Sequence, residues 1–135
     1  MVIESDEEGI EPAWLNLLTQ LPLRIIALYT SGGRSVHALV RVDMPSKEAW
    51  DLYRDHLKPA LTRLGADKGV FTAVRLTRLP SCFRLGKEDH KTGQYTKFSE
   101  PHLQRLLYLN PSAEARPLVE LPVLRHVPMW EEAYA

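Results

Sequence analysis

The sequence has a single cysteine, Cys82, among its 135 residues. One cysteine excludes an intrachain disulfide and a zinc site built from several thiolates. No apolar run approaches the roughly 18–20 residues that span a bilayer, and the acidic amino terminus lacks the basic start and apolar stretch of a signal peptide. We therefore expect no membrane segment and a reduced, cytoplasmic setting.

The chain also lacks an excess of charge, because 17 basic residues face 17 acidic ones. A neutral total argues against nonspecific coating of nucleic acid, but it leaves a local basic patch open, since the sum says nothing of where charges lie. Apolar residues make up 44% and charged residues 25%, as in an ordinary globular protein. We expect one domain, residues 1–110, followed by a proline-rich and mostly irregular extension, residues 111–135.

The spacing of apolar residues predicts alternating strands and helices. A short strand at 2–5 precedes a helix with Pro12 in its first turn. Two β-prone runs within 23–42 flank a glycine turn and predict a hairpin. A long helix capped by Ser46 follows, with a kink or break expected at Pro59.

This order needs one more strand to complete a βαββαβ sandwich. Val70–Leu76 and Leu103–Leu109 are the two candidates, and residues 86–101 between them look like a polar excursion with turns. The expected fold class is α+β, with an RRM-like (ferredoxin-like) antiparallel sheet, helices on one face and an irregular C-terminal tail. A last short helix is expected near Trp130.

Glu4 and Asp6 stand two residues apart at the end of the first predicted strand. Positions i and i+2 of a strand face the same side, and two close carboxylates repel each other unless a cation offsets their charge. Mg²⁺ takes few protein oxygens and fills its shell with water and substrate phosphates. The pair is therefore either a solvated acidic turn or part of a metal site.

The stretch SGGRSVHAL, between the two hairpin strands, combines groups that suit phosphate. Gly32 and Gly33 leave backbone N–H groups unobstructed, as in an anion-binding nest. Arg34, Ser35 and His37 add a guanidinium, a hydroxyl and an imidazole, and the last two face the same side of the strand. The alternative is a plain glycine hairpin turn beside an ordinary hydrogen-bonded histidine.

Two later features carry little information on their own. Asp67 lies in the loop after the long helix. Arg75, Arg78 and Arg84 fall within ten residues of one another. Such a group suits a triphosphate or a nucleic-acid backbone, or it is a solvated basic edge.

The order of these features along the chain resembles the archaeo-eukaryotic primase superfamily, most closely the primase-polymerase branch of plasmids, phages and other mobile elements. The resemblance rests on Glu-Ser-Asp-Glu, Ser-Gly-Gly-Arg-Ser-x-His, Gly-Ala-Asp, Arg-Leu-Pro and the run from Gln104 to Asn110, and it covers roughly residues 2–110. Ser31 and Arg34 stand where relatives often have threonine and lysine, and the first motif is Glu-x-Asp. We expect a core that lacks the amino-terminal αβ half usual in this family.

The resemblance implies a DNA primase-polymerase catalytic core that uses NTP or dNTP on a single-stranded DNA template. It assigns the catalytic and metal-binding roles, for two Mg²⁺ or Mn²⁺ ions, to Glu4, Asp6 and Asp67. It assigns the incoming nucleotide to Gly32, Gly33, Arg34, Ser35, His37 and Arg78. A replicative helicase is the expected protein partner.

Two other functions fit the same sequence. A βαββαβ sheet is a common nucleic-acid platform, so the chain can equally be a non-catalytic nucleotide- or single-strand-binding module of a larger replication protein. Base stacking on the sheet has little support, because the strands at 2–5 and 36–42 contain no aromatic residue and Tyr29 ends its strand alone. The proline-rich tail with Trp130 instead fits a small structural subunit that docks on a helicase.

Overall fold

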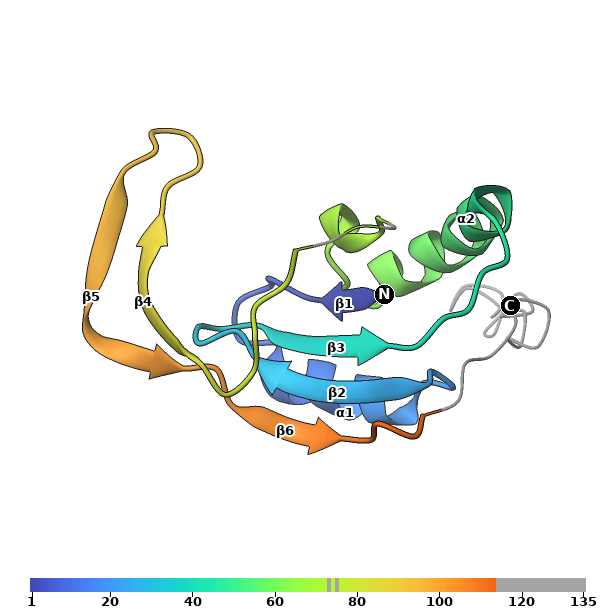
Figure 1. The fold of residues 1–135 in the computed structure, drawn as a ribbon, viewed down its shortest axis with the longest axis horizontal. Coiled ribbons are helices and arrows are strands. Elements are labelled where there is room, and N and C mark those ends of the chain that lie inside the picture. The colour runs from blue at the N-terminus through green and yellow to red at the C-terminus, as the bar shows by residue number, and fades with distance from the viewer. Residues whose placement is uncertain (73, 75, 114–135) are drawn as a thin grey trace, which may run out of the picture.

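The computed structural model describes residues 1–72, 74 and 76–113 of the chain (Figure 1). The tail for which an irregular course and a short helix near Trp130 are predicted lies largely outside these residues, and Arg75 lies outside them too. The elements are β1 (Val2–Glu4), α1 (Glu11–Gln20), β2 (Ile25–Thr30), β3 (Val36–Val40), α2 (Lys47–Arg63), the short 3₁₀ helix η1 (Lys68–Val70), β4 (Phe83–Glu88), β5 (Tyr95–Leu103) and β6 (Leu106–Leu109).

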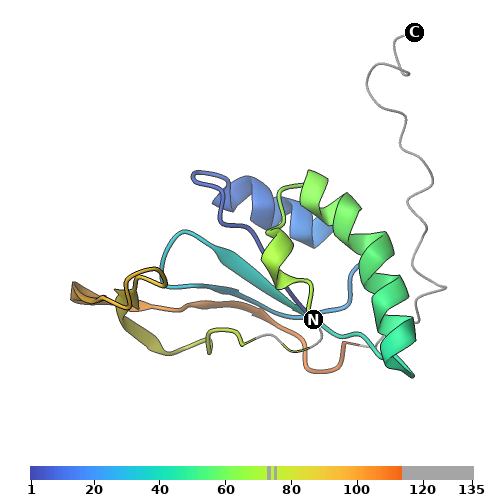
Figure 2. The same ribbon diagram turned by 90° about the horizontal axis from the view of Figure 1, so that it is seen from above.

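A four-stranded antiparallel sheet forms the body, in the order β1-β3-β2-β6. β3 lies between β1 and β2, as in the split βαβ of a ferredoxin-like sandwich, and β6 pairs with the other edge of β2. Both long helices lie on one side of this sheet (Figure 2). The expected α+β class, with an antiparallel sheet compatible with a ferredoxin-like arrangement, is confirmed.

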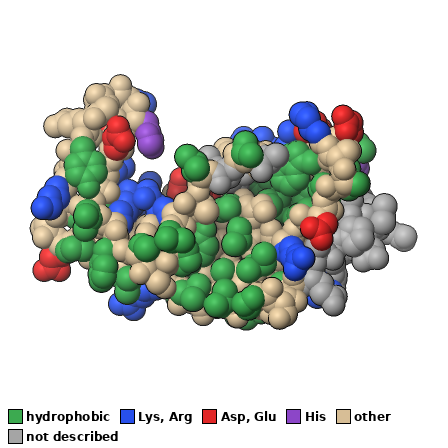
Figure 3. Space-filling view, in the orientation of Figure 1, with side chains coloured by type: hydrophobic (Ala, Val, Ile, Leu, Met, Phe, Trp, Pro, Cys, Tyr) green, Lys and Arg blue, Asp and Glu red, His purple; other side chains and the backbone are tan. Residues whose placement is uncertain are grey.

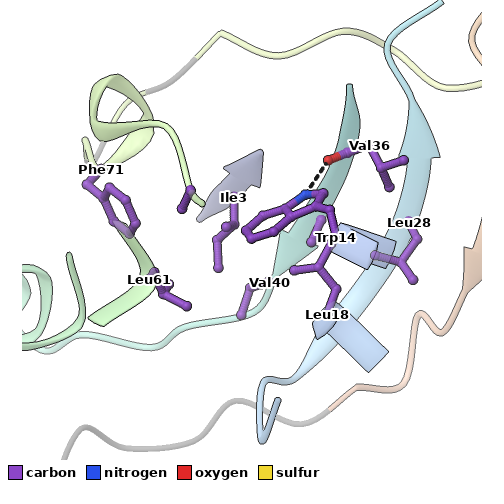
Figure 4. Close-up of a cluster of buried hydrophobic side chains, with 10 residues drawn as sticks. Ile3, Trp14, Leu18, Leu28, Val36, Val40, Leu61 and Phe71 are labelled. Carbon is purple, nitrogen blue, oxygen red and sulfur yellow. Dashed lines mark hydrogen bonds between the residues drawn. The ribbon is translucent and has the colours of Figure 1, made fainter. Parts of the chain in front are cut away.

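The core lies between the sheet and the helices. Trp14 of α1 is 1% exposed, and its Nε1–H donates to the carbonyl of Val36 at 3.0 Å (Figure 4). Alternate residues of β3 point into this core, which places His37 on the opposite face of the sheet. The buried cluster consists of Ile3, Trp14, Leu18, Leu28, Val36, Ala38, Val40, Leu61, Ala66 and Phe71.

The two helices begin where the sequence predicts. Pro12 occupies the first turn of α1, and the Oγ of Ser46 caps α2 by accepting from the N–H of Ala49 at 3.2 Å. α2 continues through Pro59 to Arg63, so a break at the proline does not occur. Proline removes one hydrogen bond of the helix. Buried side chains before and after it, Tyr53 and Leu61, hold both parts of α2 against the rest of the protein, so the helix continues. In the part of the chain that the structure describes, no helix is long and apolar enough to cross a membrane.

The strand predicted at Val70–Leu76 is wrong. η1 ends at Val70, and the described residues that follow it up to Pro80 form no strand. Residues 76–80 instead lie across the sheet on the face opposite the helices (Figures 1 and 2), where Thr77 contacts Tyr29 and His37. β2, whose Tyr29 contacts Thr77 of this segment, offers it no free edge, because β3 and β6 flank β2.

The polar excursion with turns predicted at 86–101 is a β-hairpin. Residues 86–88 belong to β4 and residues 95–101 to β5, and the two strands pair as a separate sheet that projects beyond the end of the larger one (Figure 1). Its tip turns at Gly93, which has a φ of +69°. Of the strand predicted at Leu103–Leu109, the second part is β6, while Leu103 ends β5.

Candidate functional site

Glu4, His37 and Tyr29 form one row across β1, β3 and β2, on the sheet face opposite the helices. The strand register pairs Glu4 with His37 and His37 with Tyr29. Nε2 of His37 lies 2.5 Å from Oε2 of Glu4, and the two side chains are 6% and 10% exposed. The Tyr29 ring lies beside the imidazole, with ring centroids 5.3 Å apart. The structure thus brings a residue assigned to metal together with one assigned to phosphate.

Thr77 covers this row from the segment that crosses the sheet. Its Oγ1 lies 2.6 Å from the hydroxyl oxygen of Tyr29 and 3.4 Å from Nδ1 of His37. Burial raises the pKa of Tyr29, the hydrogen bond with Thr77 opposes this rise, and the negative charge of Glu4 adds to it. The phenol therefore stays protonated at neutral pH and keeps a hydrogen-bond donor in the row.

The three carboxylates assigned to metal lie near one another along the backbone. The N–H of Asp67 donates to the carbonyl of Glu4 at 2.8 Å, so the loop after α2 runs beside the end of β1. Asp6 follows two residues later and is exposed. The side chains take different partners, since Oε2 of Glu4 contacts His37 while Oδ1 of Asp67 accepts from the N–H of Gly69 at 2.9 Å.

Among the residues that the structure describes, no three His, Cys, Asp or Glu side chains form a group that could hold a metal ion. The donor chemistry nevertheless suits Mg²⁺ or Mn²⁺, which take carboxylate oxygens and keep water and phosphate in their shells. A carboxylate has two oxygens, so Glu4 can bond His37 and a metal ion together. The residues fit the metal in ligand type, but in this structure their side chains do not converge on one point.

The glycine turn between β2 and β3 packs against the base of the β4–β5 hairpin. Gly32 has a φ of +70°, and a β-carbon there would lie 3.1 Å from the carbonyl oxygen of His102. The carbonyl of Gly32 accepts a 2.8 Å hydrogen bond from Nδ1 of His102. A β-carbon at Gly33 would lie 3.1 Å from Nη1 of Arg84. The turn therefore needs glycine both for its backbone conformation and for the close approach of the hairpin.

Ser35, at the end of this turn, is 3% exposed. Its N–H donates to Oγ of Ser31 at 3.3 Å, and its carbonyl accepts from the N–H of Ser31 at 2.8 Å. Its own Oγ has no hydrogen-bond partner within the described part of the chain. A buried hydroxyl without a partner costs about 1–3 kcal/mol, and a ligand oxygen bound there would remove that cost.

Arg84 of β4 packs against the turn at Gly33. Arg34 instead extends to Glu8, 3.8 Å away, in an exposed pair that contributes little to stability. Nε of Arg84 donates to the carbonyl of Gly86 at 3.2 Å, and its Nη atoms form no hydrogen bond or ion pair with any described residue. Burial lowers the pKa of Arg84, and the positive charge of Arg78 lowers it further. A guanidinium packed against a glycine turn favours an anion there.

Sequence reasoning assigned no role at this site to Tyr29 or Thr77. It named Arg84 only as one of three arginines that suit a triphosphate or a nucleic-acid backbone, without placing it beside the glycine turn. No local signal marks Thr77, because its contact with His37 joins residues 40 positions apart.

No protein-family model, curated protein or solved structure matches this chain. The primase resemblance therefore stays a hypothesis that rests on the order of the motifs and on the contacts described above.

Proposed function

We propose that the chain is the catalytic core of a DNA primase-polymerase, which transfers nucleotides from NTP or dNTP to a 3′-hydroxyl on a single-stranded DNA template. The observation that carries this proposal is the buried, partnerless Oγ of Ser35, at a glycine turn against which Arg84 packs. Hydroxyl, backbone N–H and guanidinium groups are the donors that bind phosphate oxygens.

In this proposal the turn holds the triphosphate. Ser35 and the backbone N–H groups of Gly32 and Gly33 donate to phosphate oxygens, while Arg78 and Arg84 neutralise their charge. His37 lies two residues after Ser35, and Glu4 fixes its ring in place. In phosphoryl transfer the protein forms few covalent bonds with the substrate, so orientation and charge neutralisation supply most of the rate enhancement.

Glu4, Asp6 and Asp67 are the residues that would hold the metal. When bound, Mg²⁺ or Mn²⁺ supplies positive charge at the attacking 3′-hydroxyl and at the leaving pyrophosphate. The hydrogen bond between Asp67 and the carbonyl of Glu4 keeps the two ligand-bearing backbones together before metal binds.

The decisive experiment is metal-dependent nucleotide incorporation on a single-stranded template. Asp6→Ala and Asp67→Asn should each abolish incorporation, because each removes a negative charge from the metal ligands. Asparagine at 67 keeps an oxygen that can accept from Gly69, so η1 keeps its cap. Asp43→Ala is the matched control, since it removes an exposed carboxylate from the loop after β3. Full incorporation by Asp6→Ala and Asp67→Asn would contradict the metal assignment.

Ser35→Ala tests the phosphate grip in the same experiment. It should weaken triphosphate binding about tenfold, the effect expected from one lost hydrogen bond to a charged group. Stability should stay equal or rise, because the substitution removes an unsatisfied buried hydroxyl. Calorimetric titration and urea unfolding measure the two effects, and unchanged triphosphate affinity would contradict the role of Ser35.

One observation favours a second function, a non-catalytic nucleotide- or single-strand-binding module of a larger replication protein. Glu4 already bonds His37, and the described carboxylates do not converge in a metal group. Nucleotide binding by the wild-type chain without incorporation, in Mn²⁺ as well as Mg²⁺, would select the module over the enzyme.

A further inference from the structure

The β4–β5 hairpin carries a row of flat side chains, of which the site above uses only Arg84. The ring of Phe98 stacks on the ring of His102, with centroids 4.3 Å apart and planes inclined by 16°. The guanidinium of Arg84 lies 5.3 Å from the centroid of Phe98. Tyr95 is close enough to act on the charge of Arg84. We call Tyr95, Arg84, Phe98 and His102 the hairpin ladder.

The hairpin is built so that the ladder faces solvent. A β-carbon at Gly86 would overlap the phenol ring of Tyr95, so that ring lies directly on the glycine backbone. Tyr95 is 58% exposed, His102 is exposed and Phe98 is half-buried. Flat side chains left open in this way suit ligands that stack.

This part of the chain is also its basic part. Between Arg78 and Arg105 there are six Lys and Arg residues against three Asp and Glu, although the whole chain is neutral. Figure 3 shows Lys and Arg side chains gathered where the hairpin meets the sheet. Because charge is separated between regions, the hairpin is complementary to a polyanion while the total is zero.

The ladder leads directly to the glycine turn. His102 bonds the carbonyl of Gly32, and Arg84 touches Gly33 while its guanidinium lies near Phe98. A strand that runs along the ladder would therefore end beside the turn and Ser35.

We propose that the β4–β5 hairpin binds single-stranded nucleic acid, with bases stacked on Tyr95 and Phe98 and phosphates bound by the surrounding Lys and Arg. Unstacked bases bind aromatic faces and guanidinium planes, and basic side chains bind the backbone between them. The inference rests on the proposed function for the role of this strand as template. A protein partner is the rival occupant, because Phe83 and Leu85 alternate with Arg84 along β4 and are exposed.

The experiment measures binding of fluorescein-labelled oligo(dT) of about 12 nucleotides, within the range of single-strand-binding surfaces, by fluorescence anisotropy. The full chain is used without nucleotide or metal. Phe98→Ala should weaken binding about tenfold through the loss of base stacking, and Phe98→Trp should keep or strengthen it. Phe83→Ala is the matched control, since it removes an exposed aromatic ring from the same hairpin, and it should change the affinity less than about twofold.

A charge readout separates nucleic-acid binding from a structural effect. Arg84→Gln should reduce the slope of log affinity against log salt by about 0.7, the value for one phosphate contact on a single strand. Absence of oligo(dT) binding by the wild-type chain would overturn the proposal. So would equal weakening by Phe83→Ala and Phe98→Ala, unchanged binding by Phe98→Ala, or Phe98→Trp binding no better than Phe98→Ala.

This result and the test of the proposed function fail separately. If the chain binds oligo(dT) through Phe98 but never incorporates nucleotides, the proposal for the hairpin is supported and the proposed polymerase activity is contradicted. If the wild type incorporates nucleotides but Phe98→Ala binds oligo(dT) unchanged, the proposed polymerase activity is supported and the proposal for the hairpin is contradicted.

Discussion

The four-stranded sheet and the β4–β5 hairpin are both antiparallel β-structure, but they place their side chains differently. One face of the sheet is buried under α1 and α2, with Ile3 and Leu18 fully inaccessible. In the hairpin most large apolar residues stay open: Phe83 is 63% and Leu85 54% exposed, while Phe98 is half-buried. The sheet therefore obtains its stability from burial of apolar surface, whereas the hairpin has little burial to contribute.

A two-stranded hairpin is marginal in water when it stands alone, so this one depends on its base. There Gln104, which is buried, donates from its side-chain amide to the carbonyls of Leu79 and Cys82 at 3.0 and 3.2 Å. His102 ties the same end to Gly32. The contrast indicates that the body carries the fold and positions the hairpin, whose open surface is left for a partner.

The largest effect is expected from Trp14→Ala. Truncation of this core ring should lower the free energy of unfolding by about 3–5 kcal/mol, and it also takes the indole donor away from the carbonyl of Val36. Urea unfolding followed by circular dichroism measures it. Phe83→Ala in the hairpin should change stability by less than about 0.5 kcal/mol. Similar losses from the two substitutions would break the comparison.

Gly32→Ala tests the joint between the two regions. Positive φ alone costs a residue with a β-carbon about 1–2 kcal/mol, and contact with the carbonyl of His102 adds to that cost. Gly9→Ala is the matched control, because Gly9 also has positive φ but nothing lies within 4 Å of an added β-carbon. Unfolding in urea should show a greater loss for Gly32→Ala, and equal losses would mean that the joint is not tightly packed.

Gly86→Ala should change global unfolding least of the three substitutions, because the hairpin contributes little buried surface. Its effect should be local, since the added β-carbon would lie 2.5 Å from the backbone carbonyl oxygen of Thr96 and must shift the pairing of β4 with β5. The new methyl group displaces the ring of Tyr95, so amide hydrogen exchange should speed up in β4 and β5 and stay unchanged in α1. Ser99→Ala, at an exposed position of β5, is the control for the ring displacement. Faster exchange throughout the sheet would show that body and hairpin unfold together.

Much of the body could be predicted from local pattern. Apolar spacing placed both helices, Ser46 marked the start of α2, and the glycines after β2 marked the turn. The hairpin escaped prediction because its strands carry few buried residues, so burial imposed no apolar alternation on them. The residues around Gly93 indicated a turn correctly, but strand pairing on either side of it left no comparable signal.

The candidate site divides in the same way. Residue types and i, i+2 spacing made Glu4, Ser35 and His37 candidates, because strand geometry places alternate residues on one face, and the order of the motifs along the chain assigned their roles. The contact of Glu4 with His37 depends on the register of β1 with β3, and Thr77 reaches that pair from 40 residues away. The local sequence determines which residues are candidates and which face of the strand they share. Only tertiary packing decides which charges pair and which hydroxyl stays unsatisfied, because those contacts join segments that no short stretch of sequence brings together.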